Sequence, residues 1–370
     1  MSSEAHTITG PIRASQRTRK FLALVVAASL LALGVVLIVL PRATDLALPA
    51  VLFLILGAEF VNGWTDAPNA IATVVGTRSL SPRAALAMAS VFNLIGVMSG
   101  TAVATTIGTG IIDSNAVNLA TVGGAMVGII VWSSATARWG IPTSESHALV
   151  AGLAGAGLAS AGPSVLLWAG WKKVLVGLGF STFLGFGAGL SLMLVVYWLF
   201  RKAVPGKVRG LFRWLQICSS AFMAFSHGSN DGQKFIGAFT LALLLGGVLP
   251  TFHIPMWVIF LCAAVMALGT AIGGWRIIRT LGRRITKLKT HQGFAAELAA
   301  AGTITLASSF GIPLSTTHTI STSIMGVGAV RRTRAVRWSV TRELVIAWLL
   351  TFPICAGISW AVVKLIRMLH

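Results

Sequence analysis

Long apolar runs separated by short basic segments dominate this chain of 370 residues. The runs suited to membrane spans are 21–40, 48–63, 84–104, 121–139, 174–200, 211–225 joined to 235–249, 257–274, 294–310 and 344–366. One transmembrane helix needs about 20 such residues, so the length allows about ten to twelve spans and no sizeable soluble domain. With a mean hydropathy of +0.85 and 10% charged residues, we predict an all-α, multi-pass protein of the plasma or inner membrane.

The charge distribution supports this interpretation. Lysine and arginine number 29 against 9 aspartates and glutamates, a formal charge of +20. In a soluble protein that excess would favour nucleic-acid binding. Here the basic residues gather in short segments between apolar runs, at 13–20, 201–213, 276–289 and 331–342. Cytoplasmic loops follow this pattern and also contact anionic lipid, so we expect the lipid bilayer as a partner and no nucleic acid.

The N-terminal segment 1–47 is predicted to be a basic tail with an extra anchor helix at 21–40. Pro41-Arg42 follows this run where a signal peptide would have small residues, so we expect the helix to be retained. The 3 cysteines are isolated and lack metal or redox spacing, which predicts packing roles and no cofactor.

Two polar interruptions break long apolar runs and resemble each other. They are the strings Asn-Gly-Trp-Thr-Asp-Ala-Pro-Asn-Ala at 62–70 and His-Gly-Ser-Asn-Asp-Gly-Gln-Lys at 227–234. Each places an aspartate, Asp66 or Asp231, three residues after a glycine. A carboxylate inside a membrane is costly and needs a partner, an ion or a water-filled cavity. We therefore predict a broken helix and a functional carboxylate at each position.

A second pair of strings follows each interruption. Gly-Ile-Pro-Thr-Ser-Glu-Ser-His ends at His147, and Gly-Ile-Pro-Leu-Ser-Thr-Thr-His ends at His318. The aspartates lie 231 − 66 = 165 positions apart and the histidines 318 − 147 = 171, so two landmarks recur at nearly one offset. This indicates an internal duplication, with a first transmembrane repeat at 48–200, a basic cytoplasmic loop at 201–213 and a second repeat at 214–370.

Basic residues indicate the orientation of the two repeats. They follow the first interruption, at Arg78 and Arg83, but precede the second, at Lys202, Lys207, Arg209 and Arg213. If basic loops are cytoplasmic, the two segments cross the membrane in opposite directions. We therefore predict inverted repeats whose broken helices meet near the midplane, as in many secondary transporters.

The residue types suit a cation and an anion together. Freed helix carbonyls with Asp66 and Asp231 suit Na⁺ or a proton, whereas half-helix N-termini suit phosphate oxygens. The second strings supply hydroxyls at Thr143, Ser144, Ser146, Ser315, Thr316 and Thr317. Hydroxyls hold an anion weakly enough to release it. Pro142 and Pro313 favour a re-entrant hairpin whose second helix begins near these hydroxyls.

Several of these strings resemble the inorganic phosphate transporter family of sodium or proton phosphate symporters. They are 66–73, 228–234, 142–147, 313–318 and 269–275, and the likeness covers 48–366. The resemblance implies two inverted repeats, often in a homodimer, that move inorganic phosphate with Na⁺ or H⁺. Three positions depart from the family's common pattern: Thr65 stands where many members have His, Pro68 where Ala is usual, and Glu145 where Ser or Thr is frequent.

The resemblance and the residue chemistry together give the candidate site. The coupling-ion candidates are Asp66, Asp231, Asn62, Asn69 and Glu145, with Na⁺ expected at the two aspartates. The phosphate candidates are the six hydroxyls together with Asn69, Asn230, Gln233 and Lys234. Glu145 leaves the coupling ion open, because a carboxylate beside the hydroxyls can carry a proton or help to hold a cation.

Other roles remain open for several of these residues. Asn62, Asn69 and Asn230 can cap half-helices, and Lys234 can neutralise Asp231 or attract the anion. His147 and His318 can carry protons or pack. Glu297 can be functional or pair with a basic loop, and Asn93 can bridge helices or contact substrate.

The predicted function is alternating-access symport of phosphate, with the cation binding first. A carrier of a related oxyanion such as sulfate is the nearest alternative. A channel would not saturate at low turnover, and a scaffold would need no duplicated membrane carboxylates. An intramembrane hydrolase would need one nucleophile and base, whereas both halves carry similar sets without a GxSxG elbow. We therefore predict that the chain is not an enzyme. The coupling ion, the phosphate species carried and the oligomer number stay open.

Overall fold

The computed structural model describes residues 44–330 and 332–369. The described part is helical without a named strand, apart from an isolated bridge between Ile112 and Leu166. Its α-helices are α2 (Thr44–Gly76), α3 (Pro82–Val97), α4 (Ala102–Gly110), α5 (Leu119–Trp139), α6 (Glu145–Ala161), α7 (Trp168–Leu199), α8 (Pro205–His227), α9 (Gln233–Leu245), α10 (Met256–Ile272), α11 (Trp275–Arg279), α12 (Thr290–Ser309), α13 (Thr316–Ala329) and α14 (Trp338–Met368). The predicted anchor helix at 21–40 lies outside the described residues.

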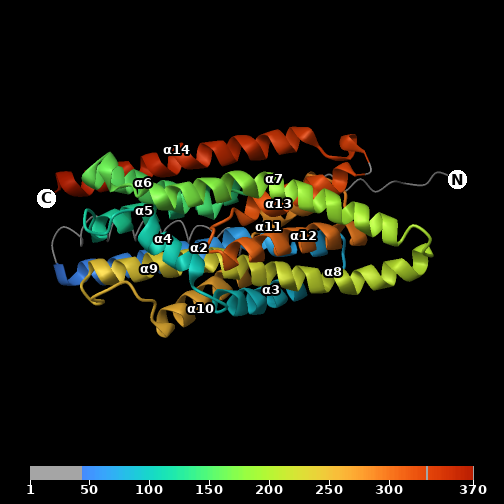
Figure 1. Cartoon of the computed structure of the whole chain (residues 1–370), viewed down its shortest axis with the longest axis horizontal. Helices are drawn as coiled ribbons and strands as arrows, with labels where there is room; N and C mark the ends of the chain where they lie inside the picture. The colour runs from blue at the N-terminus through green and yellow to red at the C-terminus, as the bar shows by residue number, and fades with distance from the viewer. Residues whose placement is uncertain (1–43, 331, 370) are drawn as a thin grey trace, which may run out of the picture.

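Short helical turns of other types connect these helices. They are the 3₁₀ turns η1 (Pro163–Val165) and η4 (Thr333–Ala335) and the π-helical turns η2 (Gly228–Gly232) and η3 (Thr280–Arg284). With them, one order of elements occurs twice: a long central helix, a bent helix pair, a helix–loop–helix hairpin, a 3₁₀ turn and a long final helix. The first set is α2, α3–α4, α5–α6, η1 and α7; the second is α8–η2–α9, α10–α11–η3, α12–α13, η4 and α14 (Figure 1). The duplication in the sequence therefore has a counterpart in the fold.

The two central helices run antiparallel to each other. Arg213 of α8 donates to the Ser79 carbonyl just after α2 at 3.3 Å, and Ser220 donates to the Ala70 carbonyl at 2.7 Å. Residue numbers therefore rise along α8 as they fall along α2. The inverted arrangement predicts this pairing. The relation of the complete halves to each other stays a prediction.

Close helix crossings also occur in matched pairs. Gly63 of α2 faces α10, where an added Cβ would lie 2.3 Å from the Met266 carbonyl oxygen. Gly228, 228 − 63 = 165 positions later, faces α3, where an added Cβ would lie 2.3 Å from the Asn93 carbonyl oxygen. Only glycine permits such backbone contact, because any other side chain would push the helices apart.

The predicted break at 62–70 is wrong, because α2 continues as one α-helix through Asp66 and Pro68. Pro68 cannot donate to the Trp64 carbonyl, but side chains and neighbouring helices stabilise the backbone around it; Ser220 Oγ of α8 donates to the nearby Ala70 carbonyl at 2.7 Å. The second interruption is also not unwound, since Gly228–Gly232 forms a π-helical turn. Such turns keep the helix continuous while they shift its side-chain register.

The structure has helix bends at two places where the apolar pattern predicted none. The expected run 84–104 is divided between α3 and α4, which meet at 67°, and α10 meets the α11–η3 segment at 62°. The segment 201–213, expected as a loop, is helical from Pro205 onward.

By length and composition, four described helices could cross a membrane, or six if each bent pair is one span. The four are α2 from Leu46, α5, α7 and α14. The number of candidate spans is lower than the ten to twelve expected. That expectation assumed that every helix is about as long as one membrane span. The structure instead uses shorter helices around its centre, such as α6 with 17 residues, α9 with 13 and α13 with 14.

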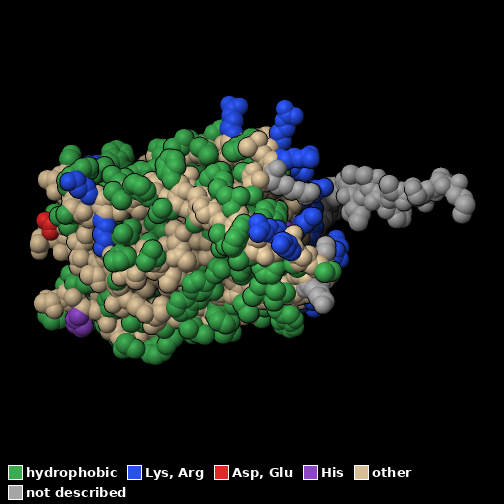
Figure 2. All heavy atoms as spheres, turned by 45° about the vertical axis from the view of Figure 1, so that its right-hand side comes forward, with side chains coloured by type: hydrophobic (Ala, Val, Ile, Leu, Met, Phe, Trp, Pro, Cys, Tyr) green, Lys and Arg blue, Asp and Glu red, His purple; other side chains and the backbone are tan. Residues whose placement is uncertain are grey.

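The surface separates apolar sides from a basic end. Figure 2 shows hydrophobic side chains over the sides of the molecule and most of the visible Lys and Arg near one end. Arg78, Arg213 and Arg283 together line a cavity of about 440 Å³. Large apolar side chains such as Phe183, 76% exposed, lie on the outer helices. This distribution suits lipid around the sides and a cytoplasmic basic end.

Candidate functional site

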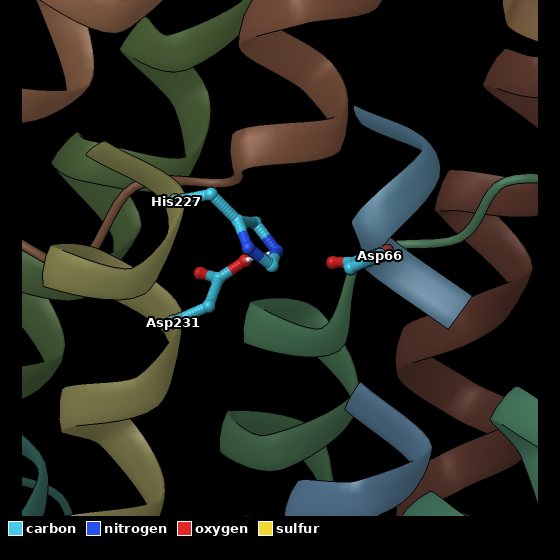
Figure 3. Close-up of side chains that lie close together, drawn as sticks. All are labelled: Asp66, His227 and Asp231. Carbon is cyan, nitrogen blue, oxygen red and sulfur yellow. Dashed lines mark ion pairs between the residues drawn. The ribbon is translucent and has the colours of Figure 1, made fainter. Parts of the chain in front are cut away.

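The two predicted aspartates meet in the interior. Asp66 of α2 and Asp231 of η2 lie with His227 of α8 so that one ligand atom from each is within 4.8 Å of the others, and all three are buried. Figure 3 shows the carboxylates and the imidazole turned toward one another from the two central helices. Asp66 and Asp231, 165 positions apart in sequence, thus lie in one buried group. The described residues thus contain a group of side chains able to hold a cation.

Each hairpin begins its second helix at the predicted hydroxyls. A glycine in the left-handed region follows the first helix, Gly140 with φ 73° directly after α5 and Gly311 with φ 61° two residues after α12. Ser144 and Ser315 then cap α6 and α13, each accepting from the backbone N–H three residues on, at 3.2 and 3.1 Å. These two serines are thus occupied as N-caps, and the next hydroxyls point elsewhere.

The two hairpins are joined by a reciprocal pair of hydrogen bonds. Ser146 Oγ donates to the Leu314 carbonyl at 2.7 Å, and Thr317 Oγ1 donates to the Thr143 carbonyl at 3.0 Å. The donors are 317 − 146 = 171 positions apart, and so are the acceptors, since 314 − 143 = 171. Each half therefore closes the other half's loop beside the aspartates.

The first-half carboxylate has few partners. Thr317 Oγ1 lies 3.3 and 3.4 Å from the two Asp66 oxygens, and no ion pair joins Asp66 to a described Lys, Arg or His. Asn69 Nδ2 donates to Thr317 Oγ1 at 3.0 Å, which leaves Asn69 Oδ1 buried without a partner. An uncompensated carboxylate beside an unused amide oxygen is an environment suited to a cation.

The second-half carboxylate is compensated by a lysine. The Lys234 ammonium, 1% exposed, contacts an Asp231 oxygen and donates to Ser146 Oγ at 2.5 Å and to the Leu314 carbonyl at 3.0 Å. The ammonium has three donors, and three acceptors surround it. Of the two roles left open for Lys234, the structure shows contact with Asp231.

His227 adds a second contact to Asp231. Its Nε2 lies 3.2 Å from Asp231 Oδ2, which also accepts from Thr316 Oγ1 at 2.5 Å. On the other side of the ring, Nδ1 lies 3.0 Å from Asn93 Oδ1, while the Asn93 amide donates to Thr270. Asn93 thus bridges helices, which is one of the two roles left open for it.

Glu145 lies at the first residue of α6, buried and held by hydroxyls. Thr65 donates to one oxygen at 2.9 Å and Ser133 to the other at 2.8 Å. The matching position in the second hairpin is Thr316, since 316 − 145 = 171. The first half thus carries an additional carboxylate where the second half carries a hydroxyl.

Some predicted residues lie in other contacts. Asn62 donates to Glu59 at 3.0 Å, Asn230 donates to Ser308 at 2.7 Å, and Gln233 accepts from the Val103 backbone N–H at 3.0 Å. Gln233 therefore binds a backbone N–H in the first turn of α4 and does not contact the aspartates. Asn62 and Asn230 do not cap broken half-helices, because the helices continue through both positions.

The two hairpin histidines stack on each other. His147 and His318 have ring centroids 4.5 Å apart, and Trp348 stacks on His318 at 3.8 Å. His147 Nδ1 also lies 2.8 Å from Ser144 Oγ. These contacts favour the packing role among the two left open for the histidines.

Sequence reasoning missed Glu59, Ser133 and the role of His227. His227 lies four residues before Asp231 and so shares its helix face, a signal that was available. Glu59 was hidden inside an apolar run. Glu297, expected either to function or to pair with a basic loop, is buried and contacts the hydroxyls of Thr73 and Ser219, the latter at 2.6 Å.

Comparison with known proteins identifies the family of this chain. Residues 62–359 match the phosphate transporter family. The chain belongs to the phosphate transporter family. A "Probable low-affinity inorganic phosphate transporter" of Rhizobium meliloti (strain 1021) is 46% identical over 303 residues, which is 81% of this chain and 91% of the relative. One of the same description from Bacillus subtilis (strain 168) is 39% identical, over 82% of this chain and 92% of the relative.

A solved structure entitled "The sodium-dependent phosphate transporter" has the same fold. It superposes with a TM-score of 0.79 at 26% identity, covering 87% of this chain and 99% of that one. This member of the phosphate transporter family is therefore a multi-pass membrane protein and not an enzyme, and the cell membrane is the location that fits its bacterial relatives.

Proposed function

We propose that this protein is a symporter that moves inorganic phosphate together with a cation by alternating access. The observation that carries the proposal is the meeting of Asp66 and Asp231, from the two halves, within one buried polar cluster. Buried carboxylates in a membrane protein mark ion or substrate pathways. The names of the relatives supply the substrate, inorganic phosphate, and that of the solved structure suggests Na⁺.

The cation site is proposed at Asp66. Its carboxylate, the free Asn69 Oδ1, the Thr317 hydroxyl and the Thr143 carbonyl are oxygen ligands from three elements. Hard cations such as Na⁺ favour oxygen ligands of this kind. A neutral amide and a carbonyl beside one carboxylate hold a single positive charge without excess negative charge. We therefore favour Na⁺ over a proton at this position.

The phosphate site is proposed at the hairpin hydroxyls, chiefly Ser146, Thr316 and Thr317. These donors sit at or next to the N-terminal turns of α6 and α13, where backbone N–H groups also favour an anion. In the observed structure they bond to carbonyls and carboxylates across the two halves. Opening the contact between the hairpins would release these hydroxyls for the anion, which couples binding to a change of conformation.

The direct test is phosphate uptake into proteoliposomes with the Na⁺ and proton gradients imposed separately. We expect uptake to require an inward Na⁺ gradient and to saturate with phosphate. Asp66→Asn, an isosteric change, is the matched control and should take up phosphate only at background rate. Uptake independent of both gradients would contradict symport, and dependence on the proton gradient alone would replace Na⁺ by H⁺.

Two further parts of the proposal have their own tests. Excess unlabelled sulfate should leave the uptake of labelled phosphate unchanged; strong competition would favour the related-oxyanion carrier. We also propose a homodimer, on the family resemblance, and the molecular mass of the purified protein in detergent checks it.

A further inference from the structure

The two halves differ in charge at matching positions around their aspartates. Asp66 lies between Asn62 and Asn69 on its helix, whereas Asp231 lies between His227 and Lys234. The offsets are equal, because 227 − 62, 231 − 66 and 234 − 69 are all 165. Two neutral amides in one half thus correspond to two groups able to carry positive charge in the other.

The Lys234 ammonium occupies the second-half counterpart of the proposed cation site. Its three acceptors are Asp231, Ser146 Oγ and the Leu314 carbonyl. The equivalent oxygens around Asp66 are its own carboxylate, Thr317 Oγ1 and the Thr143 carbonyl, which are the oxygens proposed to hold the cation. In each set the hydroxyl comes from the opposite half. One set of three oxygens is thus filled by a side chain. In the other set, Asn69 reaches Thr317 with its amide nitrogen and leaves its own oxygen unused.

We propose that the Lys234 ammonium is a resident cation that permanently fills the second of two duplicated cation sites. Each chain therefore exchanges one cation fewer than its duplicated architecture would allow. This inference rests on the proposed cation site at Asp66. A covalently attached ammonium satisfies Asp231 in every conformation and cannot be released, so only the Asp66 site is left to couple transport to a cation gradient.

The arrangement also assigns two tasks to different cations: one cation is exchanged during transport, and the other keeps positive charge beside the anion. Two exchangeable sites would place two mobile cations close together, because an oxygen of Asp66 lies within 4.8 Å of an oxygen of Asp231. Replacing one of them by a side chain keeps positive charge near the hydroxyls of Ser146 and Thr316 at all times. That charge lowers the electrostatic cost of bringing an anion next to Asp231.

The test exchanges the residues between the halves. Lys234→Asn gives the second half the amide that the first half has, and should create a second exchangeable site. The readout is the unfolding midpoint of the purified protein titrated with NaCl, at constant ionic strength with choline chloride. Stabilisation by a ligand grows with the number of ions bound, so the slope against log Na⁺ concentration should rise by about one ion per chain.

The reciprocal variant Asn69→Lys should place an ammonium beside Asp66 and remove the Na⁺-dependent part of the stabilisation. The double variant Asp231→Asn with Lys234→Asn is the matched control. It lacks the second carboxylate and should keep the wild-type slope. A structural ion pair alone would change stability in these variants but would leave the number of Na⁺ ions unchanged.

Three results would overturn the inference: an unchanged slope in Lys234→Asn, the same gain in the double control, or an undiminished slope in Asn69→Lys. Should one variant fail to fold, its reciprocal still decides. Failure of the proposed function would show differently, as wild-type protein that takes up no phosphate. An unchanged slope in Lys234→Asn beside normal wild-type uptake would count against the resident cation alone.

Discussion

Asp66 and Asp231 hold matching positions in the two halves, yet their surroundings differ in kind. Asp231 is compensated by Lys234 and contacts His227, so its half of the centre is internally neutralised. Among the described residues, Asp66 has only long hydrogen-bond contacts, to Thr317, and the neighbouring Asn69 amide has an unused oxygen. The same duplicated backbone geometry can therefore support a fixed positive charge in one copy and an exchangeable one in the other. The residue at one matching position, Asn69 or Lys234, makes the difference.

The two hairpins also differ in charge. Glu145 begins α6 where Thr316 begins α13, so the extra carboxylate belongs to the half that lacks the lysine. Glu145 is satisfied by Thr65 and Ser133, whereas Thr316 itself donates to Asp231. Negative charge is thus concentrated in the first half and positive charge in the second, across a pair of hairpins joined by matched hydrogen bonds.

The largest effect is expected for Asp231→Asn. The change leaves the Lys234 ammonium buried without its carboxylate, which costs about 3–5 kcal/mol of unfolding free energy, and phosphate uptake should fall to background. Uptake into proteoliposomes and the unfolding midpoint in detergent measure the two effects. Removing both charges, with Asp231→Asn and Lys234→Asn, should recover most of the stability. Full transport by the single variant would remove Asp231 from the mechanism.

Asp66→Asn should abolish uptake equally but leave stability almost intact. No cationic side chain among the described residues loses a partner, so the unfolding free energy should change by less than about 1 kcal/mol. The Na⁺-dependent rise in unfolding midpoint should disappear in the same variant. A loss of stability as large as that of Asp231→Asn would erase the contrast between the two halves.

Glu145→Gln should have a smaller effect. The amide keeps one acceptor oxygen and can satisfy only one of the two hydroxyls, and a lost hydrogen bond to a charged group costs about 1.5–3 kcal/mol. We expect the initial rate of uptake to fall by roughly tenfold, the equivalent of about 1.4 kcal/mol. Ser133→Ala, which removes one of the two donors, is the control. Rates equal to wild type at every pH tested would show that the additional carboxylate takes no part in transport.

Asn62→Ala should give the smallest change, because Asn62 bonds Glu59 rather than the central aspartates. We expect a loss of about 1 kcal/mol in unfolding free energy. The Na⁺ concentration for half-maximal uptake should shift less than in Asn69→Ala, which removes the unused amide oxygen beside Thr317. If Asn62→Ala weakened the Na⁺ dependence more than Asn69→Ala, the cation site would lie nearer Glu59.

The sequence predicted the helical membrane class, and the order of elements repeats where the sequence indicated a duplication. The assignment of residues to the transport site stays a prediction. Asp66, Asp231 and Lys234 were identified from charge inside apolar runs, Asn69 from the family resemblance, and the hairpins from proline and hydroxyl patterns. Gln233 was placed at the site by resemblance, but it satisfies a backbone N–H of α4. Spacing along a chain cannot show which neighbouring helix end a long amide side chain reaches.

The sequence alone determined which side chains carry the charge, because burying a carboxylate or ammonium in lipid demands a specific partner wherever the chain folds. Only the tertiary structure decided how that demand is met. It kept α2 continuous through Pro68, since neighbouring helices and hydroxyls support the backbone there. It also brought Asp66 and Asp231, 165 positions apart in sequence, into one buried group and left Asn69 Oδ1 without a partner, because α2 packs against α8 and α9.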